Sequence, residues 1–323
     1  MFLLHLKMLS LVGVLFAIVY AVVVMVGTSM GMGSFYFYLI IALGMMFIQY
    51  LIGPKVVEWQ MRLRYITRGD SPQLFAIVEG LARKAGIPAP RICIADLELP
   101  NAFAFGRSVR DGRVCVTAGL LRLLNEEELK AVLGHEISHL KNRDVAIITL
   151  LSCIPIVLYH LGWSFMYSGN RRDSRGGNAA LLGLAAFLFY WLTGLLVRYA
   201  SRIREYFADR GAIILGNQPS SLASALYKLV YGCARLDQDE IKATEGLKAF
   251  FVNDPSRALT EIRELRELDK DRSGTIDMAE LQLLRQKKIR LGAAEKLMEL
   301  LSTHPNVLKR IKQLATYQSR THA

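Results

Sequence analysis

The sequence predicts a predominantly α-helical, multi-pass membrane protein that also carries an α+β domain with a small sheet. Two observations predict the membrane part. First, 52% of the 323 residues are hydrophobic and only 21% are charged. Second, the apolar residues gather in long runs, for which a water-soluble core has little use. A third observation, two histidines at helical spacing beside a glutamate, indicates that the remaining domain contains a candidate functional site.

Four apolar runs are each long enough to cross a bilayer as a helix. They cover residues 9–26, 35–52, 145–166 and 179–197. The first run has no Ala-x-Ala cleavage site before Gly27 and is longer than the apolar part of a signal peptide, so we expect an uncleaved anchor. Runs three and four either cross the membrane in turn or form a hairpin that does not cross fully, and the sequence leaves both open.

Basic residues flank these runs and predict the orientation. They follow runs two and four and precede run three: Lys55, Arg62, Arg64, Arg68, Lys141, Arg143, Arg198, Arg202, Arg204 and Arg210. Because loops rich in Lys and Arg stay in the cytoplasm, we expect a plasma-membrane protein with its main domain on the cytoplasmic side. Arg171, Arg172 and Arg175, between runs three and four, oppose this assignment.

Charge and cysteine content exclude other classes. The net charge of +12 is concentrated beside the apolar runs, where it suits anionic lipid headgroups. No nucleic-acid recognition motif accompanies it, so we expect no nucleic-acid binding. The four cysteines form no C-x-x-C pair, and a reducing compartment is the simpler expectation.

Residues His135-Glu136-Ile137-Ser138-His139 carry the strongest chemical signal. On a helix, positions i and i+4 project from one face, so both imidazoles can bind one zinc ion, and Glu136 can act as a general base. The alternative is a pair of core histidines. Asn125 followed by Glu128 is typical of a capping box, which predicts a helix that begins near Glu126 and carries both histidines.

A zinc site with two histidines needs a third protein ligand, commonly a carboxylate from a later helix. Glu205 and Asp209 lie at i and i+4, so Glu205 can bind the metal while Asp209 orients a histidine. Acids among arginines more often form a solvated helix face. However, His139 and Glu205 stand six and eight residues from runs three and four, roughly 10 Å from the membrane in both cases, which favours a shared site.

These motifs together resemble the HtpX family of membrane-bound zinc metalloproteases, which are relatives of the CAAX prenyl proteases. The resemblance covers most of residues 1–230 and returns at 300–312. It rests on the two N-terminal runs, Asn101–Gly106, Val114–Gly119, His135–His139, the hairpin, Arg204–Asp209 and Ser302–Pro305. It implies a zincin-like α+β catalytic domain in which His135, His139 and Glu205 hold zinc and Glu136 is the catalytic base.

The resemblance also gives roles to residues that spacing alone leaves unassigned. It implies that an edge strand formed by Asn101, Ala102, Phe103 and Ala104 binds substrate as an added strand. From the sequence alone, this segment is equally an ordinary strand paired with Arg113 to Thr117. The resemblance further implies that His304 lies near the scissile carbonyl and stabilises the oxyanion. Without it, His304 would be assigned to the surface.

A twelve-residue EF-hand pattern departs from the family as we know it. Gly274 permits its sharp turn, and the oxygen ligands for Ca²⁺ would come from Asp269, Asp271, Ser273, Thr275, Asp277 and Glu280. EF-hands usually pair through the position of Ile276, so a lone loop could dimerise or be only structural. Because it lies between Glu205 and His304, calcium could also control how His304 docks.

We therefore expect six segments. Residues 1–53 form two transmembrane helices, 54–144 the first part of the catalytic domain, 145–197 the hairpin, 198–255 the second part, 256–290 the calcium insert and 291–323 the C-terminal helices. The expected function is zinc-dependent hydrolysis of peptide bonds in misfolded or unassembled membrane proteins. Two alternatives stay open: a peptidase for specific or lipidated substrates, and a catalytically idle calcium-binding scaffold. The sequence does not give the oligomeric state.

Overall fold

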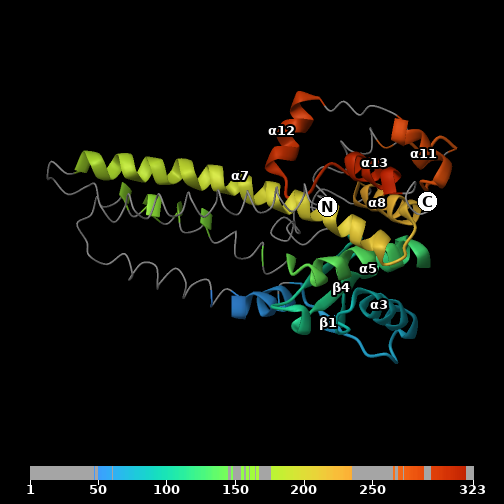
Figure 1. The fold of residues 1–323 in the computed structure, drawn as a ribbon. Coiled ribbons are helices and arrows are strands. Elements are labelled where there is room, and N and C mark those ends of the chain that lie inside the picture. Colours follow the sequence, from blue (N-terminus) through green and yellow to red (C-terminus); the bar gives the residue numbers. More distant parts are fainter. Residues whose placement is uncertain are drawn as a thin grey trace. The chain divides into compact units, whose positions relative to one another are not determined.

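The structure is a computed structural model that describes residues 47, 50–59, 61–144, 147, 154–155, 158–159, 161–163, 165–166, 176–234, 265, 268–271, 273–286 and 292–317 (Figure 1). Run one lies outside the described residues, and run two does so except for residues 47 and 50–52. The chain divides into two compact units, one of residues 1–53 and 146–203, the other of residues 54–145 and 204–323. A mostly helical protein with a small mixed sheet is confirmed.

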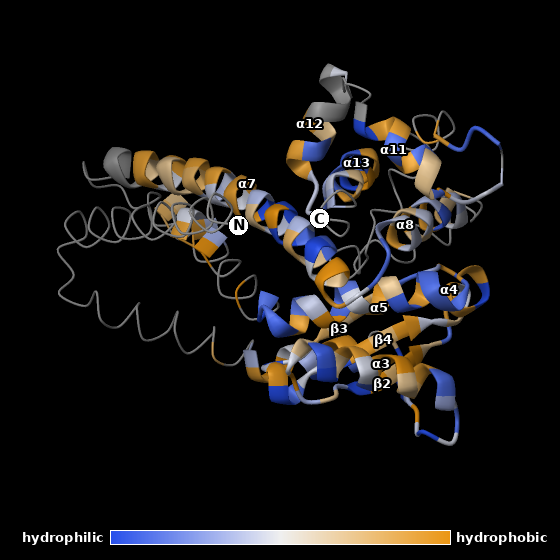
Figure 2. Cartoon of the chain, turned by 45° about the vertical axis from the view of Figure 1, so that its right-hand side comes forward, coloured by the Kyte–Doolittle hydropathy of each residue, from blue (hydrophilic) through white to orange (hydrophobic). Residues whose placement is uncertain are grey.

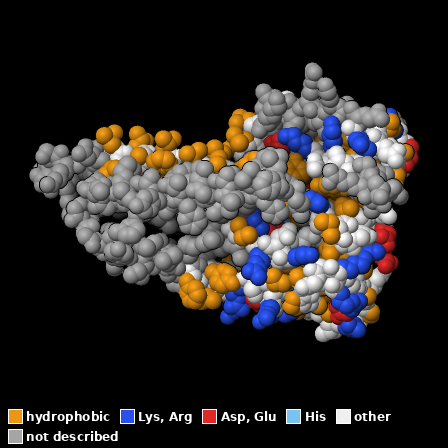
Figure 3. Space-filling model, viewed as in Figure 1, with side chains coloured by type: hydrophobic (Ala, Val, Ile, Leu, Met, Phe, Trp, Pro, Cys, Tyr) orange, Lys and Arg blue, Asp and Glu red, His pale blue; other side chains and the backbone are white. Residues whose placement is uncertain are grey.

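In the first unit, the described residues centre on helix α7 (Gly176–Ile214), which continues beyond Ile203 into the second unit. Leu181, Leu184 and Leu188 of α7 are more than 60% exposed. Figure 2 shows that this stretch is rich in hydrophobic residues, and Figure 3 shows apolar side chains along it. In the described part of the chain, Ala180–Ile214 is the one stretch long and apolar enough to cross a membrane. It contains all but the first residue of the predicted fourth run.

Run three packs against α7 where both are described. The rings of Trp163 and Phe187 are 5.7 Å apart, and those of Tyr159 and Tyr190 are 5.6 Å apart. Such ring pairs are typical of closely packed helices. The two runs therefore lie side by side, as the predicted hairpin requires.

The second unit is built on a four-stranded sheet in the order β1-β2-β4-β3. The strands are β1 (Arg64–Tyr65), β2 (Arg91–Ala95), β3 (Ala102–Phe105) and β4 (Arg113–Thr117), with a short 3₁₀ turn at Val109–Asp111. β2 and β4 are parallel, and the other pairs are antiparallel. The pairing with Arg113 to Thr117, which the sequence left as one of two alternatives, is observed for Ala102–Phe105, and β3 is an edge strand of this sheet.

Successive side chains of β3 point into two different hydrophobic cores. Phe103 and Phe105 pack with Met61, Cys93 and Cys115 on one face of the sheet. Ala102 and Ala104 lie in the other core, which the helices cover. Because successive side chains of a strand point to opposite faces, the helices meet only small side chains on β3. The backbone of the edge strand can therefore approach helix α5 closely.

Helices fill the larger core of this unit. They are α3 (Pro72–Ala85), α4 (Ala118–Leu123), α5 (Glu126–Lys141), α8 (Pro219–Ala234), α11 (Met278–Gln286) and α13 (Val307–Tyr317). This unit also contains α12 (Ala293–Leu301), whose Leu297, Met298, Leu300 and Leu301 side chains are exposed. The fully buried side chains between them include Leu81, Leu133, Ile137, Leu226 and Leu229. α5 packs against α3, α8 and β3, so it is held on several sides.

The predicted start of α5 is confirmed. The side chain of Asn125 accepts a hydrogen bond from the Glu128 N–H at 2.9 Å, and the Glu128 carboxylate accepts one from the Asn125 N–H at 3.0 Å. This reciprocal capping box satisfies two backbone donors that a helix start leaves unpaired. Lys228 of α8 contacts the same carboxylate at 2.8 Å. Both local sequence and tertiary packing thus fix this end of α5.

Candidate metal centre

Helix α5 presents both histidines of the motif to one place. His135 and Glu136 are buried, and the His139 side chain is 15% exposed. The Nε2 atoms of the two imidazoles are 3.1 Å apart. Positions i and i+4 therefore meet as the spacing predicts.

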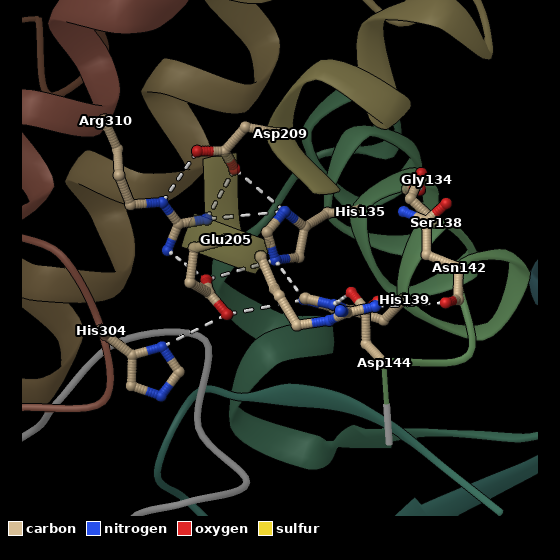
Figure 4. A network of polar contacts seen from close by, with 11 residues as sticks. Gly134, His135, Ser138, His139, Asn142, Asp144, Glu205, Asp209, His304 and Arg310 are labelled. Carbon is tan, nitrogen blue, oxygen red and sulfur yellow. Dashed lines mark hydrogen bonds and ion pairs between the residues drawn. The ribbon is translucent and has the colours of Figure 1, made fainter. Parts of the chain in front are cut away.

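Helix α7 supplies a carboxylate to the same place (Figure 4). Glu205 Oε2 lies 3.5 Å from His135 Nε2, and Glu205 Oε1 lies 3.5 Å from His139 Nε2. One donor atom from each of the three residues lies within 4.8 Å of the other two. The predicted combination of His135, His139 and Glu205 is thus brought together from two helices.

The hydrogen bonds on the far side of each ring show that these donors fit a cation. His135 Nδ1 lies 2.9 Å from Asp209 Oδ1, and His139 Nδ1 lies 2.7 Å from Asp144 Oδ2. A carboxylate at Nδ1 holds the proton there and leaves the Nε2 lone pair free for a metal. Two such lone pairs beside a carboxylate repel one another unless a cation lies between them. Four ligands at the usual zinc bond lengths stand about 3.3 Å apart, close to the observed spacing.

Asp209 takes the place that its i+4 spacing predicts, but its own partner was not predicted. Arg310 of α13 contacts the two Asp209 oxygens at 2.6 and 2.9 Å, and its Nη1 atom lies 3.1 Å from Glu205 Oε2. Arg310 is fully buried. Its charge offsets those of the two carboxylates, so it joins α13 to the face of α7 that carries Glu205 and Asp209.

Asp144 is the second residue that sequence reasoning missed. Its carboxylate joins His139 to Arg204 of α7, whose guanidinium contacts the other Asp144 oxygen. Asp144 follows the end of α5 and Arg310 lies on a separate helix, so neither shares a periodic pattern with the histidines. In the sequence, Asp144 is indicated only by the presence of a carboxylate within a few residues of the histidine motif, which is weak evidence for a contact.

His304 lies beside the same group of residues. Its Nδ1 atom is 3.5 Å from Glu205 Oε1, and the side chain is 8% exposed. Among the described residues, neither ring nitrogen of His304 has a hydrogen-bond partner. A buried imidazole without a partner is costly, which is typical of a group that a ligand or substrate completes. An assignment of His304 to the surface, which the local sequence favours, is wrong.

Glu136 lies between the histidines and the edge strand. Burial raises the pKa of its carboxyl group, and the two neighbouring imidazoles partly oppose this. The backbone N–H of Ala104 in β3 donates a hydrogen bond to the carboxylate. A base whose pKa is raised toward neutrality is well matched to proton transfer. Of the four residues expected to bind substrate, Ala104 reaches the site, whereas Asn101 and Phe103 have buried side chains.

The charge around the histidines also affects their protonation. Burial alone would lower the pKa of His139, but Asp144 and Glu205 outweigh it and hold that pKa well above its ordinary value. For His135, Asp209 and Glu205 likewise outweigh burial and raise the pKa. The surroundings therefore favour positive charge at this position, as a cation site requires.

The EF-hand pattern forms a second group of acids. Carboxylate oxygens of Asp269, Asp271 and Glu280 lie within 4.8 Å of one another. Gly274 has φ +78°, which suits glycine. Ser273 and Asp277 make hydrogen bonds within the loop, and Ser273 Oγ lies 3.0 Å from Thr275 Oγ1. Helix α11 begins at the end of the loop, where the pattern predicts a helix.

With this geometry established, comparison with known proteins identifies the family. The model of "Peptidase family M48" matches residues 69–318, which include both histidines, Glu205, His304 and Arg310. The chain belongs to peptidase family M48. The resemblance drawn from the motifs is thus confirmed, because curated relatives of this M48 member carry the name HtpX.

Two of these relatives are proteins called "Protease HtpX homolog". The one from Methanothermobacter thermautotrophicus is 46% identical over 243 residues, covering 75% of this chain and 92% of the relative. The one from Aeropyrum pernix is 33% identical over 298 residues, covering 90% of this chain and 88% of the relative. This M48 family member therefore matches nearly the full length of both.

A solved structure shares the fold. The crystal structure of Ste24p from S. mikatae superimposes with a TM-score of 0.52 at 16% sequence identity and covers 96% of this chain. The M48 chain in turn spans 65% of the length of that Ste24p chain. At this identity the likeness concerns the fold alone.

Proposed function

We propose that the protein is a membrane-bound, zinc-dependent endopeptidase. The observation that carries the proposal is the convergence of His135 Nε2, His139 Nε2 and a Glu205 carboxylate, with a second carboxylate on the far nitrogen of each imidazole. In this arrangement His135, His139 and Glu205 would hold the ion. Zinc, when bound, acts as a Lewis acid and makes water a stronger nucleophile at neutral pH. Membership of a peptidase family supports the reaction class.

Three parts of the chain transfer protons, stabilise the developing charge and align the substrate. Glu136 takes a proton from the attacking water and later delivers it to the leaving amine, without a covalent intermediate. His304, whose ring nitrogens lack partners among the described residues, donates to the oxygen of the scissile carbonyl as it becomes negative. The edge strand β3 aligns an extended substrate by backbone hydrogen bonds beside Glu136.

We propose unfolded or unassembled membrane proteins as the substrates and the cytoplasmic side of the plasma membrane as the location. The four apolar runs, and the exposed apolar stretch of α7, support a membrane anchor. The basic residues that flank three of the runs support the orientation. An anchored site is supplied with membrane proteins more readily than with soluble ones. Labelling of single cysteines introduced on either side of each run in intact cells tests the orientation.

We also propose that residues 269–280 bind one calcium ion. The buried carboxylates of Asp269 and Glu280 support this, as does the close approach of their oxygens to Asp271. Tyr227 of α8 donates to Asp269 at 2.9 Å, and Ser224 of α8 bonds to the backbone of Ile276. α8 also carries Lys228, which contacts Glu128 at the start of α5. Calcium could therefore modulate the peptidase through α8 as well as through His304.

The deciding experiment uses the detergent-purified full chain and a casein-like or unfolded membrane protein as substrate. We expect the wild type to contain about one zinc per chain and to cleave, whereas Glu136→Gln keeps the zinc and does not cleave. Zinc in both proteins with cleavage in neither would reject the general degradative function. A folded wild type that binds no zinc would reject the metal assignment itself.

A further inference from the structure

The chain turns sharply where α5 ends, immediately after His139. The N–H groups of Asn142 and Arg143 donate back to the carbonyls of Ser138 and Leu140 at 3.0 and 3.1 Å. Arg143 has φ +58°, a left-handed conformation that only a few per cent of residues other than glycine adopt. This turn places the Asp144 carboxylate against the last turn of the helix, where it contacts His139. A strained backbone at this point indicates that the direction of Asp144 matters.

Both carboxylate oxygens of Asp144 have partners. Oδ2 lies 2.7 Å from His139 Nδ1, and Oδ1 contacts the guanidinium of Arg204. Asp144 is 5% exposed, so these contacts are shielded from water. A carboxylate held in this way fixes both the tautomer and the ring orientation of the imidazole that it contacts. The His139 Nε2 lone pair is thereby aimed at Glu205.

Arg204 joins this turn to the helix of the third ligand. It also donates to the carbonyl of Asn142 at 3.2 Å, and it directly precedes Glu205 on α7. The same guanidinium therefore contacts the end of α5 while its backbone neighbour faces the two imidazoles. Arg310 does for His135 what Arg204 does for His139, because it binds the Asp209 carboxylate that contacts the His135 ring.

We propose that Asp144 is a positioning residue for His139 and that Arg204 fixes the position of Asp144 relative to Glu205. This inference rests on the proposed zinc site. The ion pair then fixes the distance between the helix of the two histidines and the helix of the third ligand. Removal of the Asp144 charge would leave both histidines present, but the His139 ring would no longer be held in one orientation.

The test measures the zinc affinity of the detergent-solubilised full chain by competition with a chelator, and the visible spectrum of its cobalt form. Asp144→Asn is expected to weaken zinc binding by about 10–100-fold. Asp144→Glu is expected to restore part of the affinity. Arg204→Gln is expected to weaken binding less, and to add no more than about twofold in the Asp144→Asn background, because the two side chains act as one unit. Arg143→Gly is expected to keep wild-type affinity.

Glu128→Gln is the matched control, because Glu128 is a buried carboxylate at the other end of α5, where it pairs with Lys228. Wild-type affinity in this control, with altered cobalt spectra confined to the Asp144 and Arg204 variants, supports the inference. Wild-type affinity in Asp144→Asn, or an equal loss in Glu128→Gln, overturns it. A wild type that binds no zinc instead rejects the proposed function, which separates the two failures.

Discussion

The hydroxyl of Ser224 bonds to both backbone polar groups of Ile276. It accepts from the N–H at 2.7 Å and donates to the C=O at 3.2 Å. Ile276 occupies the position through which EF-hands usually pair, and both residues are buried. In the calcium loop proposed for residues 269–280, a side chain of α8 therefore satisfies the backbone groups through which a second EF-hand would pair.

Ser224→Ala tests this relationship. Because the variant leaves the buried Ile276 N–H without its partner, we expect a loss of about 1–3 kcal/mol in the free energy of unfolding and weaker calcium binding. Ser221→Ala, on the same helix, is the control. Calcium titration by calorimetry and thermal unfolding would measure both effects. Equal behaviour of the two variants would contradict a role of Ser224 in the loop.

Removal of a carboxylate from the loop tests calcium itself. Glu280→Gln takes away the acid expected to bind calcium through both oxygens. We expect calcium to raise the unfolding temperature of the wild type but not that of this variant. The proteolysis rates of both are then compared with and without calcium at constant zinc. Identical rates in the wild type under the two conditions would rule out modulation by calcium.

Substitution of the proposed base separates chemistry from metal binding. Glu136→Gln preserves shape but cannot take a proton, so we expect kcat to fall by about 10²–10⁴-fold while zinc content is unchanged. Glu127→Gln, an exposed neighbour on α5, should cleave at the wild-type rate. Substantial activity in Glu136→Gln would mean that another group accepts the proton.

His304→Ala tests stabilisation of the oxyanion. If His304 donates to the developing negative charge, kcat should fall by about 10²–10³-fold with little change in KM. Zinc content distinguishes this role from metal binding, because a donor to substrate is not needed to hold the ion. Loss of zinc in proportion to the loss of activity would make His304 a ligand instead.

Ala104→Pro tests the edge strand. Proline removes the N–H that donates to Glu136, and it is tolerated where a strand does not use that N–H for pairing. We expect kcat/KM to fall by roughly tenfold or more, the value of one or two hydrogen bonds at about 1 kcal/mol each. Ala104→Gly keeps the N–H and should stay near the wild type. Equal losses in both variants would indicate a packing effect.

The structure confirms the features that the sequence predicts from local patterns. The capping box of Asn125 and Glu128 and the i, i+4 spacing of His135 and His139 depend on residues within a few positions of one another. The same holds for β3, whose pairing with β4 joins nearby segments. Run one and most of run two lie outside the described residues, so the multi-pass prediction stays a prediction.

The sequence by itself determined which helix carries the histidines, which later helix carries Glu205, and which twelve residues form the acidic loop. Helical and turn geometry relate such residues through short, fixed spacings. Only the tertiary structure decided that Arg310 holds Asp209 across 101 residues, that Arg204 holds Asp144 across 60, and that Ser224 meets Ile276 across 52. These contacts depend on which helices pack against one another, and no periodic pattern in the sequence identifies the packing partner.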